Sequence, residues 1–307
     1  MSRSRPPAAR ALTVAALVAC LPTACSAPTS TEPDRAPTGP TVSTVAYGDD
    51  SHQVADLHLP DERSNGPTPV VVLIHGGYWR SGYDRSLETA LADELVSDGY
   101  VVWNVEYRAA DDPGGGWPGT YDDVAAAVDI LPSALETAGV DAGPVAVVGH
   151  SAGGTLALWL GARGGLADGA VGSDPRLVPD AVVSQAGVND LERASATGAG
   201  GGAVDALLGG RPDEVPERYA VASPIRRVPL GVDTLVLTGA LDATVPVEQT
   251  TLYGDAAEAA GDTVTTLTVD GEDHFAHLDP TSDSWAAVRT YLASTVGPTR
   301  ADDVSSG

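Results

Sequence analysis

The segment GHSAG at residues 149–153 has the composition of a turn that carries a nucleophile. It follows the apolar run Pro144–Val148 and precedes a helical pattern, so Ser151 lies where a strand turns tightly into a helix. Such a turn lifts the hydroxyl clear of the backbone, and the new helix presents free N–H groups to a developing anion. We therefore predict that Ser151 is a nucleophile; the alternative is an ordinary glycine-rich turn.

A serine hydroxyl is inert at neutral pH, so this prediction requires a base and a group that orients the base. The apolar run 232–238 is followed by Asp242, and the run 263–269 is followed by His274. Both candidates thus follow the C-terminal ends of predicted strands, where open parallel sheets place their sites. The order Ser151, Asp242, His274 is that of the α/β-hydrolase arrangement and differs from the two familiar protease orders.

Two neighbouring residues compete for these roles. Asp273 is an alternative to Asp242, which could itself be a solvated loop acid in so acidic a chain. His277 competes with His274, and the pair could be a fragment of a metal site, but no third ligand follows at helical spacing. We favour His274 because it is nearer the strand end and directly precedes Phe275.

The segment HGGYW at residues 75–79 directly follows the apolar run Pro69–Ile74. Two successive glycines let backbone N–H groups face a shared cavity. We predict that three N–H groups hold the oxyanion of a tetrahedral intermediate, those of Gly76, Gly77 and Ala152. His75 is expected to brace this loop, and His150 to point into the structure without a chemical role.

Short apolar runs alternate with helical periodicity along residues 41–296, which predicts one α/β domain with helices on both faces of a mostly parallel sheet. Eight strands are predicted, the first two antiparallel at one edge: 41–47, 53–59, 69–74, 100–107, 144–148, 180–184, 232–238 and 263–269. Apolar spacing predicts helices that include Leu87, Leu91 and Leu95, then residues 124–131, 151–163 and 285–292. A small, mobile cap is expected after the sixth strand, around the glycines at 198–202.

The N-terminus predicts export. Three arginines precede the apolar run 11–19, which is too short to span a bilayer and is followed by Cys20 and Cys25. Residues 1–25 are therefore predicted to be a secretory signal of the lipoprotein type, with either cysteine acylated; a cleaved signal without lipid is the alternative. Residues 26–40 are a Pro/Ser/Thr-rich linker and 297–307 a flexible tail. The folded domain has no cysteine, which excludes disulfides and thiolate sites there.

The composition limits the partners of the chain. With 17 basic and 42 acidic residues the net charge is −25, which opposes binding to nucleic acid. Hydrophobic residues make up 43%, enough for a buried core. We expect contact with a membrane only through the N-terminal lipid, and no oligomeric state is predicted.

Several segments together resemble the α/β-hydrolase superfamily: HGGYW at 75–79, VEYR at 105–108, GHSAGG at 149–154, LDATVP at 241–246 and GEDHF at 271–275. More narrowly, they are similar to HGG-type bacterial esterases, including the feruloyl/acetyl-xylan esterase-like and kynurenine-formamidase-like groups. The resemblance implies a serine hydrolase that needs neither a metal nor an organic cofactor. HGGYW matches the formamidase pattern, but an export signal is unexpected for an intracellular tryptophan-catabolic enzyme and favours an ester substrate.

We therefore expect an exported carboxylesterase that cleaves a small or aryl ester outside the cytoplasm through an acyl-enzyme on Ser151. Aromatic side chains that suit an acyl or aryl group are expected to line its pocket, namely Tyr78, Trp79 and Trp117. The remaining tryptophans are expected in the core, at Trp103, Trp159 and Trp285. An amidase or arylformamidase would use the same catalytic residues, and a non-catalytic envelope binding protein is the alternative from another class. A prolyl-oligopeptidase-like peptidase is disfavoured, because no large companion domain is evident.

Overall fold

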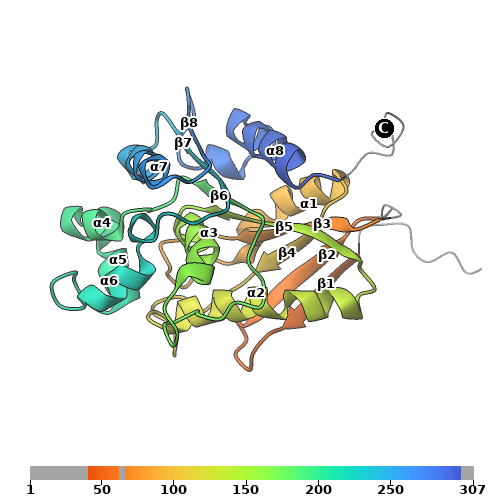
Figure 1. Cartoon of the computed structure of the whole chain (residues 1–307), viewed down its shortest axis with the longest axis horizontal. Coiled ribbons are helices and arrows are strands. Elements are labelled where there is room, and N and C mark those ends of the chain that lie inside the picture. The colour runs from red at the N-terminus through yellow and green to blue at the C-terminus, as the bar shows by residue number, and fades with distance from the viewer. Residues whose placement is uncertain (1–40, 62–65, 299–307) are drawn as a thin grey trace, which may run out of the picture. The chain divides into compact units, whose positions relative to one another are not determined.

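One eight-stranded sheet organises residues 41–61 and 66–298, the part of the chain that the computed structural model describes. The strands are β1 (Thr41–Ala46), β2 (Val54–Leu59), β3 (Thr68–Ile74), β4 (Val101–Val105), β5 (Ala142–His150), β6 (Ala181–Gln185), β7 (Asp233–Gly239) and β8 (Val264–Val269). Their order is β1-β2-β4-β3-β5-β6-β7-β8, and only the pairs β1–β2 and β2–β4 are antiparallel (Figure 1). The predicted mostly parallel α/β sheet is confirmed. The predicted signal and linker lie outside the described residues, as does the tail from residue 299 on.

Helices cover both faces of the sheet (Figure 1). They are α1 (Thr89–Ser97), α2 (Gly119–Thr137), α3 (Ala152–Ala162), α4 (Leu191–Thr197), α5 (Ala203–Leu208), α6 (Pro216–Ala222), α7 (Glu248–Ala260) and α8 (Asp283–Thr295). Alternate residues of a strand face opposite sides, so Val70 and Val72 pack with α2 and α3, while Val71 and Leu73 pack with α1 and α8. Among the described residues, no helix is long and apolar enough to cross a bilayer.

Two differences between the predicted and the observed helices have a clear physical reason. Leu87 was expected on a helix face, but it lies in the 3₁₀ turn Arg85–Glu88 before α1 and is 36% exposed. Helix α7 was not predicted, because its buried side is composed mainly of small and polar residues and shows little apolar periodicity. The expectation for the core tryptophans holds, since all three are fully buried: Trp103, Trp159 and Trp285.

A small cap lies between β6 and β7, as expected from the glycine-rich stretch there. It consists of α4, the 3₁₀ turn Ala199–Gly201, α5 and α6, drawn in green-blue in Figure 1. Four glycines in this stretch have positive φ values between 62° and 79°: Gly198, Gly200, Gly201 and Gly202. This backbone favours glycine and explains the composition of the segment. The mobility of the cap stays a prediction.

Glu88 carries a carboxyl group that is buried in the fold. The residue is 1% exposed, and its Oε1 has no hydrogen-bond partner within the described residues. Burial raises the pKa of this carboxyl from 4.5 to about 8. The native state therefore keeps a proton on Glu88 that the unfolded chain has already lost, so the contribution of Glu88 to stability is expected to fall as the pH rises from 4.5 towards 8.

Glu88→Gln is expected to remove this slope and to increase the free energy of unfolding at pH 7 by about 3 kcal/mol. Chemical denaturation of both proteins at pH 5 and pH 7 measures the effect. Glu94→Gln is the matched control, because the Glu94 side chain is 41% exposed. Equal pH dependence in the wild type and in Glu88→Gln would refute the assigned protonation.

Candidate active site

The candidate nucleophile lies on a strained turn between β5 and α3. Ser151 has φ 53° and ψ −118°, a backbone conformation that non-glycine residues rarely adopt outside functional sites. A Cβ atom on Gly149 would lie 2.1 Å from the Gly153 carbonyl oxygen, and one on Gly153 would lie 2.0 Å from the Ile74 oxygen. Both positions therefore require glycine, so the turn can place Ser151 at the carboxyl end of the central strand.

Two loops at the same edge of the sheet bring His274 and Asp242 to the serine. His274 Nε2 lies 3.0 Å from Ser151 Oγ, and His274 Nδ1 lies 2.7 Å from Asp242 Oδ2. A carboxylate only accepts hydrogen bonds, so Nδ1 carries the proton and Nε2 is free to accept the hydrogen of the serine hydroxyl. The side chains of His274 and Asp242 are only 5% and 0% exposed. This is the geometry of a nucleophile, its base and an orienting acid.

The surroundings of Asp242 favour its charged form. Burial raises the pKa of this carboxyl, but the hydrogen bonds that it accepts more than offset burial and hold the pKa below its ordinary value. The donors are His274 and the backbone N–H groups of Val245 and Thr244, which both lie 2.8 Å from Oδ1. A stable carboxylate at this position keeps the tautomer of His274 and can stabilise an imidazolium.

The two competing residues lie in other environments. Asp273 Oδ1 accepts hydrogen bonds from the backbone N–H groups of Phe275 and Ala276, at 2.9 and 3.2 Å, so it supports the turn after His274. His277 is fully buried, burial lowers its pKa to about 4, and neither ring nitrogen has a partner within the described chain. Within residues 41–61 and 66–298, no group of three or more histidine or acidic side chains could hold a metal ion. The structure thus joins Asp242 and His274, not their neighbours, to Ser151.

The three backbone N–H groups predicted to hold the oxyanion are unpaired within the described part of the chain. The N–H groups of Gly76, Gly77 and Ala152 find no acceptor among the residues that the structure describes. Helix α3 begins at Ala152, so this N–H belongs to the unpaired first turn. A Cβ atom on Gly76 would lie 3.0 Å from Ser151 Cβ, so the loop presses directly against the turn. These donors can stabilise negative charge beside Ser151.

His75 braces this loop, as expected. Its Nδ1 lies 2.7 Å from the Gly76 carbonyl oxygen and its Nε2 lies 3.0 Å from Glu106 Oε1. The ring stacks on Tyr107 at 4.3 Å, and the Tyr107 hydroxyl donates to the His75 carbonyl. Glu106 had no predicted role, although an acidic residue directly after a buried strand was a signal for one.

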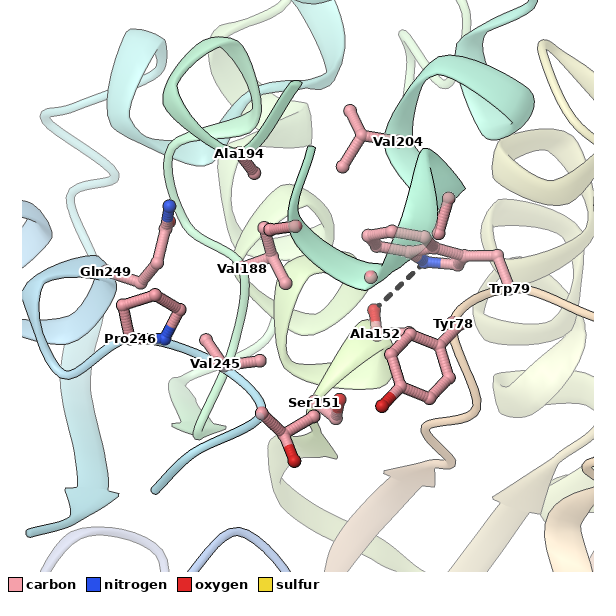
Figure 2. A pocket seen from close by; sticks show the side chains of 14 residues that line it. Tyr78, Trp79, Ser151, Ala152, Val188, Ala194, Val204, Val245, Pro246 and Gln249 are labelled. Carbon is pink, nitrogen blue, oxygen red and sulfur yellow. Dashed lines mark hydrogen bonds between the residues drawn. The ribbon is translucent and has the colours of Figure 1, made fainter. Parts of the chain in front are cut away.

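An apolar cavity opens beside Ser151, between the core of the domain and the cap (Figure 2). Its volume is about 20 Å³, little more than the space that one water molecule needs. Tyr78 and Trp79 line it as predicted, and Trp79 Nε1 donates to the Ala152 carbonyl at 3.2 Å. Sequence reasoning missed its aliphatic walls, which include Val188, Val204, Val245 and Pro246.

Trp117, the third predicted pocket residue, lies elsewhere. It is not among the residues that line the cavity, and its ring packs edge-on against Tyr121, with the ring centroids 5.2 Å apart. Tyr121 in turn contacts the buried Trp159 at 4.9 Å. Trp117 is therefore held in an aromatic cluster over α2 and α3.

Comparison with known proteins agrees with this geometry. Residues 55–256 match the BD-FAE family model. The chain is 32% identical over 213 residues to esterase LipC of Mycobacterium tuberculosis, covering 67% of this chain and 52% of LipC. It is also 32% identical over 97 residues to LipM of the same organism, a probable carboxylic ester hydrolase, covering 32% of this chain and 22% of LipM. The chain thus spans about half the length of LipC and less of LipM.

Solved structures share the fold. A truncated carbohydrate esterase from gut microbiota superposes with a TM-score of 0.73 at 23% identity, covering 84% of this chain and 97% of that chain. Esterase B of Lactobacillus rhamnosis superposes with a TM-score of 0.70 at 22% identity, covering 85% of this chain and 86% of that one. At this identity the likeness shows a common architecture.

Proposed function

Because the chain belongs to the BD-FAE family of α/β-hydrolases, we propose that it is a carboxylesterase that hydrolyses a small or aryl ester through an acyl-enzyme on Ser151. One observation carries this proposal: the hydrogen-bonded series from Asp242 through His274 to Ser151, with distances of 2.7 and 3.0 Å. The esterase names of LipC and LipM support it.

In the first half of the reaction, Ser151 Oγ attacks the ester carbonyl carbon while His274 Nε2 takes the hydroxyl proton. Negative charge moves to the carbonyl oxygen, which the N–H groups of Gly76, Gly77 and Ala152 stabilise. Asp242 stabilises the imidazolium that forms. When the tetrahedral intermediate collapses, His274 returns the proton to the leaving oxygen, and the alcohol departs from the acyl-enzyme.

In the second half, water replaces the alcohol. His274 Nε2 takes a proton from water as the water oxygen attacks the acyl carbon, and the same three N–H groups stabilise the second oxyanion. Collapse of this intermediate breaks the bond to Ser151 Oγ, and His274 returns the proton to the serine. The acid leaves and the free enzyme is restored.

Hydrolysis of p-nitrophenyl acetate, together with labelling of Ser151 by a fluorophosphonate, tests this function. Turnover and labelling of Ser151 are the expected results. Turnover of N-formylkynurenine in preference to aryl esters would instead assign an arylformamidase, which would use the same residues. A folded protein that neither turns over esters nor reacts with the probe would favour a binding protein.

The small cavity favours a short acyl group. Its size admits a methyl group more readily than a longer chain. By contrast, Leu241 and Phe275, the sequence neighbours of Asp242 and His274, are 63% and 61% exposed. Exposed apolar side chains next to the catalytic residues suit an aryl group on the alcohol side of the ester. We therefore assign the acyl group to the cavity and the alcohol to the side of Leu241 and Phe275.

Val204→Ala is expected to widen the cavity and to raise the ratio of kcat/KM for butyrate over acetate esters by about tenfold, since a methylene in an apolar pocket is worth about 1–3 kcal/mol. Val204 lies in α5 and lines the cavity (Figure 2). The matched control is Val288→Ala, the same truncation on the other face of the sheet. An unchanged ratio in Val204→Ala would refute the assignment of the acyl group to this cavity.

Export is part of the proposal. The basic residues, short apolar run and cysteines within residues 1–25 support a secretory signal, with Cys20 or Cys25 as the site of a lipid anchor. Only one of the two cysteines is expected to carry the lipid. One of the variants Cys20→Ser and Cys25→Ser should therefore lose incorporation of a labelled fatty acid, and the other should keep it. Labelling of neither cysteine in an exported protein would assign a secreted enzyme without lipid, and retention of the full chain in the cytoplasm would refute export.

A further inference from the structure

His150 is a buried imidazole next to Ser151 that the mechanism above does not use. The residue is 3% exposed. Its Nε2 lies 2.9 Å from the backbone carbonyl oxygen of His274, and the centroids of the two rings are 4.8 Å apart. The residue that precedes the nucleophile is therefore hydrogen-bonded to the residue that carries the base, although 124 positions separate them in the chain.

The hydrogen bond determines how the ring of His150 is protonated. A carbonyl oxygen only accepts, so Nε2 carries the proton and donates it. Burial, together with the neighbouring rings of His274 and His277, holds the pKa of His150 well below its ordinary value. The ring is thus neutral, with one N–H pointing at the loop of His274, and it does not compete with His274 as a base.

The sheet by itself does not join Ser151 to His274 directly. Ser151 follows β5 and His274 follows β8, and β6 and β7 lie between these strands. Three strand spacings amount to about 14 Å, so the loop after β8 must reach back across two neighbouring strands. The bond from His150 is a direct link between the turn that carries Ser151 and this loop.

The other side of the ring faces the oxyanion loop. A Cβ atom on Gly76 would lie 3.1 Å from His150 Nδ1 and 2.9 Å from the His150 carbonyl oxygen. Nδ1 has no hydrogen-bond partner within the described residues. A buried nitrogen without a partner costs stability, and an apolar side chain of similar size would avoid this cost. Packing alone therefore does not explain why a histidine occupies this position. The hydrogen bond from its Nε2 to the His274 carbonyl oxygen does explain it.

We propose that His150 is a positioning residue, whose Nε2–H holds the His274 carbonyl and so sets the distance between His274 Nε2 and Ser151 Oγ. It acts through His274 and contacts no reacting atom. The inference rests on the proposed function, because it assigns a role within the same site.

The test compares His150→Met with His150→Gln in the full chain. Glutamine brings an amide N–H close to the place of the imidazole Nε2–H, whereas methionine has a similar length and no donor. The rate at which a fluorophosphonate labels Ser151, and kcat for p-nitrophenyl acetate, are expected to fall about 10- to 100-fold in His150→Met, with KM within about threefold. His150→Gln should retain these rates within about fivefold of the wild type.

The control is His277→Leu, which removes a second buried imidazole whose nitrogens have no partner in the described chain. Its rates should stay within about twofold of the wild type. Rates in His150→Met equal to the wild type, or equal losses in His150→Met and His150→Gln, would overturn the proposal. If His150→Met fails to fold, His150→Gln decides, and a loss beyond about tenfold there would overturn it.

A second readout needs no turnover. The Nδ1 proton of His274, which is bonded to Asp242, should give a downfield proton resonance in NMR spectra. We expect this resonance to shift or broaden in His150→Met and to be retained in His150→Gln; an unchanged resonance in both would refute the link. A wild type that neither reacts with the probe nor turns over esters would refute the proposed function, and the resonance would still test the role of His150.

Discussion

Ser151→Ala is expected to reduce kcat for p-nitrophenyl acetate by about 10³-fold or more, because the proposed acyl-enzyme forms on this hydroxyl and the members of a triad act as a unit. The N–H groups of Gly76, Gly77 and Ala152 remain in this variant, and we expect them to account for the residual rate. KM is expected to change little, since Ser151 contributes little to binding of the ground state. Steady-state kinetics on protein of confirmed secondary structure measures the effect.

Ser133→Ala provides the control for this substitution. Ser133 lies on α2, where its hydroxyl donates to the Ile130 carbonyl at an exposed position, and it does not line the cavity. It should leave both turnover and fluorophosphonate labelling unchanged. If Ser151→Ala kept its hydrolytic activity and reacted with the probe elsewhere, the nucleophile would have to be reassigned.

Asp242→Asn is expected to lower kcat by about 10³- to 10⁴-fold. The amide can donate to His274 Nδ1 in place of accepting from it, which would move the imidazole proton to Nε2. The ring would then face Ser151 with a donor and could not take the serine proton. The variant also removes the charge that stabilises the imidazolium.

Asp273→Asn is the matched comparison, since it makes the same chemical change on a neighbour of His274. An asparagine oxygen can still accept from the N–H groups of Phe275 and Ala276, so the turn is preserved and activity should stay within about twofold. The opposite order of effects, with Asp273→Asn the more damaging, would transfer the role of the orienting acid to Asp273.

Local sequence was sufficient for most of the sheet and for the turn at Ser151. Runs such as Pro69–Ile74 are apolar on both faces, so they predict buried parallel strands whatever surrounds them. A Cβ atom at position 149 or 153 would lie about 2 Å from a backbone oxygen, so the tight strand-to-helix turn requires glycine at both positions. Helix α7 escaped prediction because tertiary contacts place Tyr253 and Ala257 in the core without an apolar stripe around them.

For the candidate site too, local sequence predicted some residues and the tertiary structure alone placed others. Residue type and position after a strand were enough to predict Ser151, Gly76 and Gly77 and to limit the acid to Asp242 or Asp273 and the base to His274 or His277, because each of these signals lies within a few residues of a strand end. The sequence favoured Asp242 and left Asp273 as the alternative, and the tertiary structure places Asp242 against His274. Only the tertiary structure placed Trp117 away from the cavity and joined His150 to the loop of His274. The physical reason is that hydrogen bonds and cavity walls form between segments far apart in the chain. Which residues meet in these contacts depends on how the loops at the edge of the sheet pack together, and a local sequence pattern does not predict that packing.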